Sequence, residues 1–340
     1  MPLRTGEYTV RVLIAVLILA LAFVLWRVRE AVVIVFGGVV LAVLVRMIMR
    51  PVVRHTPVRE GWALLIAVLL LIGIIALTGL LIGTRISSQM EELQRTLQSS
   101  LSQVATALDR SPLGHGAAQL LRGQATSAMS LAHVAALATG TVTALVDGVL
   151  MIFLGLYLAA NPALYERGLC RLVPPGGRPA TGRALAATGV ALTRWLQGVM
   201  LSMVIIAVTT GLGLWGLGVP LALSLAILAG LLEFIPYLGP IIAAVPAVLV
   251  AFAVSPTRAL EVIALYVLIH QLEGDLVVPL IQRWAVALPP AMAIVAVLVF
   301  GLLFGPLGFV FATPMMVAAI ALIDTLYVKS PPLQDRSART

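Results

Sequence analysis

The feature that most constrains the fold of this chain is a series of long stretches without a charged side chain. Residues 61–84, 195–232, 234–257 and 284–323 contain no Asp, Glu, Lys or Arg, and most of their side chains are apolar. About 20 such residues form one helical crossing of a bilayer. Charged residues make up only 11% of the chain, whereas a soluble domain has roughly a quarter. The sequence therefore predicts an all-α polytopic membrane protein.

The spacing of these stretches predicts about eight transmembrane helices, with broken or re-entrant segments in the C-terminal half. The first two spans, 12–26 and 31–45, are short. The stretch 12–26 also resembles the apolar part of a cleaved signal peptide, but the next apolar stretch follows almost at once, which favours a span. The expected segments are three spans over 1–84, an amphipathic extramembrane helix over 85–138, a fourth span over 139–161, a basic cytoplasmic loop over 162–194, a transport core with broken helices over 195–328 and a polar tail over 329–340.

The basic residues indicate how the chain is oriented in the membrane. There are 22 of them, and all but Lys329 are arginine. With eight spans and both termini in the cytoplasm, most of them lie in cytoplasmic segments, as the positive-inside rule requires. They therefore need not indicate a nucleic-acid partner. The single lysine lies outside any glycine-rich phosphate loop, so no built-in ATPase is predicted, and Cys170 has no second cysteine for a disulfide.

The segment that begins at residue 85 has a different pattern. Apolar residues recur at steps of three and four from Ile86 to Leu108, with Glu, Gln, Arg and Ser between them. This spacing predicts an amphipathic helix of about six turns. Two roles stay open: a surface helix that packs on its own subunit or lies at the membrane interface, and a coiled-coil-like contact between subunits.

Polar and helix-breaking residues interrupt the apolar stretches of the C-terminal half. Carboxylates and free backbone groups at membrane depth need protein or water partners, and transporters use interrupted helices to bind ions and polar solutes. Helix-breaking residues here are Pro236, Gly239, Pro240, Gly274, Pro279, Gly305, Pro306, Gly308 and Pro314. Polar candidates for a solute or ion pathway are Glu233, Tyr237, His270, Gln271, Glu273 and Asp275.

Two further polar residues have alternative interpretations. Asp147 lies among apolar neighbours of the fourth span, where it either belongs to a pathway or caps a helix near the water interface. His270 lies three residues before Glu273 on one helix face, a spacing that favours a proton relay. An isolated histidine at this depth is more often a hydrogen-bond donor between helices.

Four motifs together resemble the autoinducer-2 exporter (AI-2E) family in order and spacing. They are Arg194-Trp-Leu-Gln197-Gly198, Glu233-Phe-Ile-Pro236-Tyr237-Leu-Gly239-Pro240, Gln271-Leu-Glu273-Gly274-Asp275 with Pro279, and Leu303-Phe304-Gly305-Pro306-Leu-Gly308 with Pro314. The resemblance implies a transporter of the bacterial inner (cell) membrane with eight spans, assembled as a homo-oligomer, for which a pentamer is described. It also adds Arg194 and Gln197 to the pathway candidates. Family members are credited with export of autoinducer-2, a furanone-derived quorum-sensing signal, and some with exchange of sodium or lithium for protons.

The sequence departs from the family pattern at three positions. Asp275 replaces the usual asparagine, Glu233 stands where a neutral residue is frequent, and Leu288 stands where histidine is frequent. The two additional carboxylates favour coupling to a cation or a proton.

Other classes of protein lack their motifs here. The four histidines show no zinc-ligand spacing and no Gly-x-Ser-x-Gly elbow occurs, so we expect no enzyme, no cofactor and no metal site. A membrane scaffold would also carry the small-residue packing motifs, but it does not need buried acids or broken helices. The sequence therefore predicts a secondary transporter that exports a small polar solute similar to autoinducer-2, with a sodium(lithium)/proton antiporter as the alternative and a non-transporting scaffold as a third interpretation.

Overall fold

The computed structural model of the 340-residue chain describes residues 5–74, 76, 77, 80, 131–236, 238–282 and 289–328. Every regular element in these ranges is a helix, which confirms the predicted all-α membrane fold. Four of the described helices are long and apolar enough to cross a membrane, or five if a bent pair counts as one span. The expected number of eight spans stays a prediction, and the amphipathic segment lies outside the described residues over 85–130.

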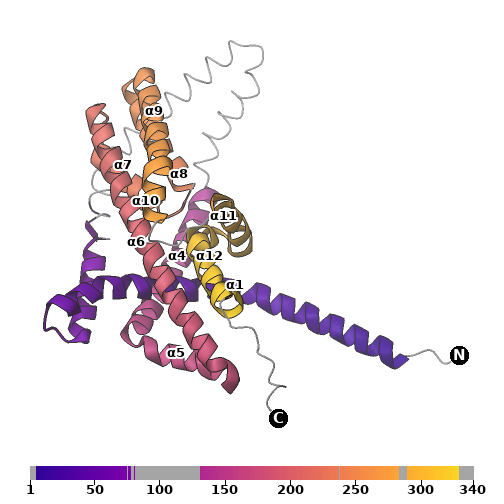
Figure 1. Cartoon of the computed structure of the whole chain (residues 1–340). Helices are drawn as coiled ribbons and strands as arrows, with labels where there is room; N and C mark the ends of the chain where they lie inside the picture. Colours follow the sequence, from indigo (N-terminus) through magenta and orange to yellow (C-terminus); the bar gives the residue numbers. More distant parts are fainter. Residues whose placement is uncertain are drawn as a thin grey trace.

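Figure 1 shows the arrangement of the helices. Their bounds are α1 (Thr5–His55), a helix over Glu60–Ile74, α4 (Leu131–Ala160), α5 (Pro162–Arg171), α6 (Arg178–Gly216), α7 (Ala222–Leu232), α8 (Leu238–Val254), α9 (Pro256–Leu272), a π-helical turn over Glu273–Val277, α10 (Val278–Gln282), α11 (Pro290–Phe304), α12 (Pro306–Ile323) and a second π-helical turn over Asp324–Val328.

Helix α1 is longer than the sequence pattern suggested. It runs through 51 residues, including 27–30, where the apolar pattern predicted a break between two short spans. No Gly or Pro occurs between Trp26 and Ala31. The charged residues there therefore interrupt the apolar pattern without ending the helix. At 1.5 Å per residue α1 is about 77 Å long, more than twice the thickness of a hydrocarbon core. Its N-terminal half projects away from the other labelled helices (Figure 1).

Small residues bring α1 and α4 close together. A Cβ on Gly155 would lie 3.0 Å from the backbone oxygen of Gly38, and a Cβ on Gly37 would lie 2.7 Å from the sulfur of Met151. Glycine allows this approach because it presents no side chain to the facing helix. The outer surface of α4 is apolar and exposed, as in a helix that faces lipid. The helix begins at Leu131 rather than at the predicted residue 139.

The basic segment over 162–194, expected as a loop, is mostly helical. Helix α5 starts directly after Asn161, and α6 starts at Arg178, far before the apolar stretch at 195. Pro179 falls within the first turn of α6, where its missing N–H is not needed. The predicted turn is limited to the Pro-Pro-Gly-Gly sequence over 174–177. The segment is therefore basic as predicted but not a loop.

Helices α7 and α8 and helices α11 and α12 form two pairs of apolar helices, of which only α12 is long enough to count as a candidate membrane span. At about 1.5 Å per residue, the 11 residues of α7 are too short to cross a bilayer alone. In each pair the chain reverses. A Cβ on Gly239 would lie 1.9 Å from the oxygen of Leu232, and a Cβ on Gly308 would lie 2.0 Å from the oxygen of Phe300. In a straight helix, residues seven or eight positions apart are separated by roughly 10 Å or more, so the chain must turn back between them. Both pairs pack against α6 directly or through their partner helix.

Candidate functional site

The candidate site lies where α7 ends and α8 begins. Helix α7 ends at Leu232, and six residues later the chain enters α8 at Leu238 after a turn that contains Glu233 and Pro236. The backbone closes this turn itself: Phe234 N donates to Leu231 O at 3.2 Å and Ile235 N donates to Leu232 O at 2.9 Å. Unsatisfied backbone groups are therefore few, as a turn at membrane depth requires.

This turn joins two apolar cores. Leu232 packs against the core of Ile206, Ala229 and Ala243, which α6, α7 and α8 share. Phe234 packs instead against a second core that contains Trp195 of α6 and Val317 of α12. The rings of Trp195 and Phe234 meet edge to face, with centroids 5.7 Å apart. Glu233 therefore sits between two packed cores that hold its neighbours on either side.

Glu273 reaches this region from the end of α9. It begins the π-helical turn Glu273–Val277, in which Val278 N–H donates to Glu273 O five residues earlier. Pro279 follows this turn and cannot donate to a backbone carbonyl, which explains why regular α-helical bonding is relaxed just before it. Single π-helical turns are rare and occur often at functional sites.

The structure brings Glu233 and Glu273 together. Both side chains are buried, with exposed fractions of only 7% for Glu233 and 8% for Glu273. The Glu233 and Glu273 carboxyl groups lie close enough to act on each other electrostatically. On the other side of Glu273, His270 Nδ1 lies 2.9 Å from Glu273 Oε2. Because two neighbouring carboxylates repel each other, this arrangement favours a proton on one of the two acids.

One oxygen of this site has no protein partner. Among the residues that the structure describes, Glu233 Oε2, Tyr266 OH and Thr313 Oγ1 are buried side-chain atoms without a hydrogen-bond partner. Buried polar atoms are usually paired, so such atoms indicate places where a ligand, an ion or water belongs. Glu233 Oε2 is thus a free acceptor at the position where the two acids meet.

The sequence analysis did not single out Tyr266. Tyr266 packs against two apolar cores, one that contains Leu214 and one that contains Ile206. It precedes His270 by four residues and Glu273 by seven. Positions i, i+4 and i+7 share a helix face, so this polar stripe was readable from the spacing. Thr313 offered no comparable signal, because an isolated threonine is common in apolar helices.

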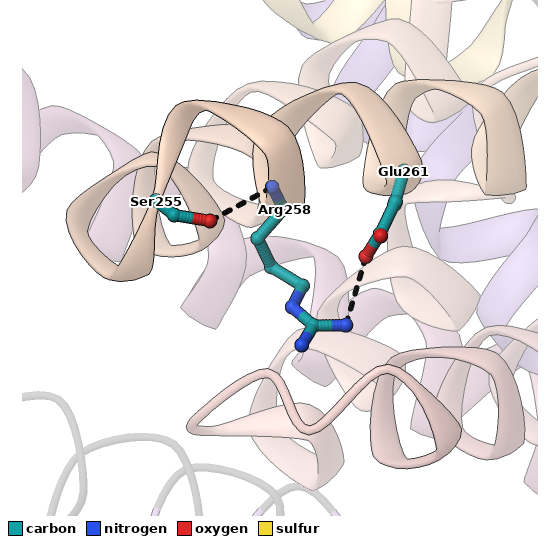
Figure 2. Close-up of polar contacts among 3 residues, drawn as sticks. All are labelled: Ser255, Arg258 and Glu261. Atoms are coloured by element: carbon teal, nitrogen blue, oxygen red, sulfur yellow. Dashed lines mark hydrogen bonds and ion pairs between the residues drawn. The ribbon is translucent and has the colours of Figure 1, made fainter.

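The start of α9 is fixed by short-range polar contacts, which Figure 2 shows. Ser255 is the N-cap, and its Oγ accepts a hydrogen bond from Arg258 N at 3.1 Å. Arg258 Nη1 in turn donates to Glu261 Oε2 at 2.8 Å. Glu261 is partly exposed and far along the helix from Glu273, so this acid has a structural partner of its own and lies outside the buried pair.

The other predicted pathway residues lie apart from the two acids or face outward. Gln271 Nε2 donates to Asp275 Oδ2 at 2.8 Å, but both side chains are exposed. Arg194 and Gln197 flank the buried Trp195 on α6 and are themselves exposed. Asp147 belongs to α4, which packs mainly on α1 and α5. Tyr237 lies outside the described residues.

The second break, between α11 and α12, contains no acidic residue. Gly305 separates α11 from α12 with φ 69° and ψ −148°, a conformation open almost only to glycine. Pro306 then starts α12, and Arg29 Nη1 of α1 donates to Leu303 O at 3.2 Å, beside the break. Pro314, expected to interrupt a helix, lies buried inside a continuous α12. This corrects the expectation, since neighbouring helices can accommodate a proline within a membrane helix.

Apolar helices that reverse at two breaks, with paired buried acids at one of them, define a polytopic helical membrane transporter. Comparison with known proteins identifies the particular family. The sequence profile described as "AI-2E family transporter" matches residues 13–328. The chain belongs to the AI-2E transporter family, which confirms the resemblance found in its motifs.

Individual relatives agree with this assignment. The AI-2 transport protein TqsA of Escherichia coli (strain K12) is 30% identical over 311 residues, which cover 84% of this chain and 85% of TqsA. YrrI of Bacillus subtilis (strain 168), whose name gives only a general transport role, is 30% identical over 48% of this chain and 46% of its own length. A Mycobacterium tuberculosis (strain CDC 1551 / Oshkosh) relative, MT0215, is 31% identical over 59% of this chain and 54% of its own length. The chain thus spans about half the length of these last two relatives.

Proposed function

We propose that this protein is a secondary transporter that exports a small polar organic solute of the autoinducer-2 type across the bacterial inner membrane. The observation that carries the proposal is the pair of buried acids, Glu233 and Glu273, which meet where α7 ends and α9 becomes a π-helical turn. The name of TqsA supports autoinducer-2 as the solute. The basic residues support a multi-pass orientation with both termini in the cytoplasm.

The unpaired oxygen of Glu233 can accept a hydrogen bond from the solute. A carboxylate accepts hydrogen bonds from hydroxyl groups, and the autoinducer-2 type of solute is rich in them. Glu233 Oε2 is buried and has no partner among the described residues. A polar solute that donates to this oxygen replaces the water that burial has removed, and it competes with the Glu273 contact for the same carboxyl group.

The same pair supports coupling of transport to a proton. Two neighbouring carboxyl groups favour one proton between them. A cation or solute that favours the ionised form of Glu233 displaces that proton, and His270, whose Nδ1 lies 2.9 Å from Glu273 Oε2, is the adjacent group that can accept it. Binding and proton release are then linked, which is what coupled export requires. Exchange of sodium or lithium for protons at these acids is the second candidate function, since two carboxyl groups also suit a small cation.

The experiment uses the full chain in sealed liposomes. Movement of labelled autoinducer-2 is measured with and without an imposed proton or sodium gradient. We expect gradient-dependent movement that Glu233→Gln and Glu273→Gln reduce at least tenfold (roughly), because each removes a charge from the buried pair. Glu261→Gln is the matched control: it neutralises an acid on the same helix that pairs with Arg258, and it should leave transport near the wild-type rate.

The other results separate the alternatives. Cation-for-proton exchange without solute movement would establish the antiporter instead. Solute movement that both glutamine variants preserve would show that the acids do not form the site. Neither activity in any gradient would favour the scaffold.

We also propose that the protein assembles as a homo-oligomer, with a pentamer as the expected state from the family resemblance. The projecting half of α1 offers a long helix beyond the body of the fold for contact with another copy (Figure 1). Native mass spectrometry of the purified protein tests this directly, and a monomer at all concentrations would contradict it.

A further inference from the structure

Helix α5 leaves the membrane-facing helix α4 at a right angle. The axes of the α4 stretch Leu145–Ala160 and of α5 differ by 91°, with only Asn161 between the two helices. The exposed side chains along α4 are apolar, as expected of a helix that faces lipid; Phe153, for example, is 58% exposed. If α4 runs across the bilayer, α5 runs along its surface.

The two faces of α5 differ in chemistry. Leu164, Leu169 and Leu172 are 60%, 49% and 82% exposed. Their spacing of five and three residues places them within about 140° of the helix surface. The opposite face carries Glu166, and Arg167 lies between that face and the edge of the leucine face. None of the residues of α5 is buried in the fold.

The neighbouring helix does not cover the leucine face. Helix α5 packs on the start of α6, where the sulfur of Cys170 would lie 3.8 Å from a Cβ on Gly182. On a helical wheel Cys170 belongs to the polar half of α5, so the leucines point away from α6. Within the part of the chain that the structure describes, this leucine face has no partner.

Basic side chains surround this face. Arg167 and Arg171 belong to α5, and Arg178 starts α6 directly after the short turn. Arg167 Nε donates to Ala163 O and Arg178 Nε donates to Val173 O. A guanidinium has five N–H donors, so both groups keep donors for further acceptors. The only acid of α5 is Glu166.

We propose that α5 is an interfacial anchor that inserts its leucine face into the cytoplasmic leaflet and binds anionic phospholipid headgroups through its arginines. An amphipathic helix with exposed leucines on one side and arginines beside them suits this surface in both packing and charge. Phosphate oxygens are good partners for guanidinium groups, and the cytoplasmic leaflet carries the negative lipids. A soluble acidic partner would match the arginines but not the leucines.

The anchor acts on the candidate site through α6. Helix α5 packs against the first turns of α6, and further along the same helix Trp195 packs on Phe234, next to Glu233. A fixed α5 therefore fixes one end of the helix against which the α7–α8 turn rests. The proposal does not depend on which solute the transporter carries.

The test uses the whole protein in vesicles of phosphatidylethanolamine and phosphatidylglycerol. Cys170 is the only cysteine, so Cys170→Ser gives a background in which a nitroxide spin label reports one position. Labels are attached to Leu172→Cys on the apolar face and to Glu166→Cys on the polar face. Leu169→Cys is a second reporter of the apolar face, should Leu172→Cys fold poorly.

We expect the label at position 172 to collide with oxygen in the bilayer more than with a water-soluble nickel complex, and the label at position 166 to show the reverse. Equal access of nickel to both positions would overturn the proposal, since α5 would then lie in water. Strong immobilisation at 172 with access to neither reagent would also overturn it, since protein would cover the leucine face.

A second comparison tests the headgroup contacts. In vesicles of phosphatidylcholine alone, nickel access to the label at position 172 should rise severalfold, and the double change Arg167→Gln and Arg171→Gln should produce the same rise in phosphatidylglycerol vesicles. Insertion that is identical with and without anionic lipid, and unaffected by the loss of both arginines, would overturn the role of the charges.

Discussion

The substitution Gly239→Ala tests the geometry of the turn on which the candidate site depends. A Cβ at this position would lie 1.9 Å from Leu232 O and 2.5 Å from the Leu232 carbonyl carbon. Both atoms belong to the backbone, so no side-chain rotation relieves the overlap. The start of α8 and the end of α7 must move apart by about 1.5 Å or more before the contact becomes an ordinary one.

The expected cost follows from this overlap. Forcing an additional carbon into a packed contact typically destabilises a protein by roughly 1–3 kcal/mol. Replacing a helical glycine by alanine returns at most about 1 kcal/mol through the lower entropy of the unfolded chain. The net effect should lower the temperature of unfolding by several degrees. Transport should fall further than the folded fraction, because Glu233 lies in the turn that is displaced.

The matched control is Gly216→Ala. Gly216 is the last residue of α6, and no atom lies within 4 Å of a Cβ placed on it. This variant should unfold at or above the wild-type temperature. Both variants and the wild type are compared in one detergent at one heating rate, because irreversible unfolding depends on the rate. Equal unfolding temperatures and equal transport for the two variants would refute the close contact between Gly239 and Leu232.

Three further predictions concern the surroundings of the site. Gly305→Ala should destabilise the protein by about 1–3 kcal/mol, because the φ of 69° and ψ of −148° suit only glycine; an unchanged midpoint in thermal unfolding would contradict this conformation. In a double-mutant cycle, Trp195→Ala and Phe234→Ala should show a coupling of about 0.5–1.5 kcal/mol from their edge-to-face contact, and independent effects would mean that the rings do not touch. Ser255→Ala should cost about 1 kcal/mol and speed amide exchange at Arg258, while Ser255→Asp should restore the cap.

Local chemistry accounts for three helix boundaries in the C-terminal half of the chain. Gly305 requires a backbone conformation that other residues avoid, Ser255 is a strong N-cap, and Gly218 ends the turn after α6 with a φ of 66°. Each of these positions is determined by its own residue type and its immediate neighbours. Such signals are visible in a sequence without knowledge of the fold.

Helix continuity and packing depend on parts of the chain that are distant in sequence. The charged residues from Arg27 to Glu30 suggested an end to a span, yet α1 continues through them and Arg29 finds an acceptor on α11. Pro314 suggested a break, yet α12 continues with that residue buried. A polarity change or a proline does not by itself end a helix when another helix supplies contacts.

The candidate site was predictable as a set of residue types but not as a geometry. The sequence placed Glu233 and Glu273 among nine polar candidates, and only the fold shows that these two lie buried and within reach of each other. Asp275 belongs to the same motif as Glu273, but its side chain is exposed and pairs with Gln271. Residues two positions apart point in different directions on a helix, so Glu273 and Asp275 do not share a face. Spacing alone does not show which of the two faces the buried side.

Both breaks contain the same close contact between a glycine and an earlier carbonyl oxygen. This contact alone therefore does not explain why only the first break contains an acid. Gly239 and Gly308 both bring a helix start against an earlier carbonyl oxygen, that of Leu232 and that of Phe300. The difference lies in what surrounds the first break: the chain before Glu233 belongs to the core of α6–α8, and the chain after it belongs to the core shared with α1 and α12. We therefore expect a ligand that separates Glu233 from Glu273 to shift the two cores relative to each other. Packed cores switch between discrete arrangements rather than deforming gradually. We therefore propose this break, and not the second, as the place where binding is converted into a change of access across the membrane.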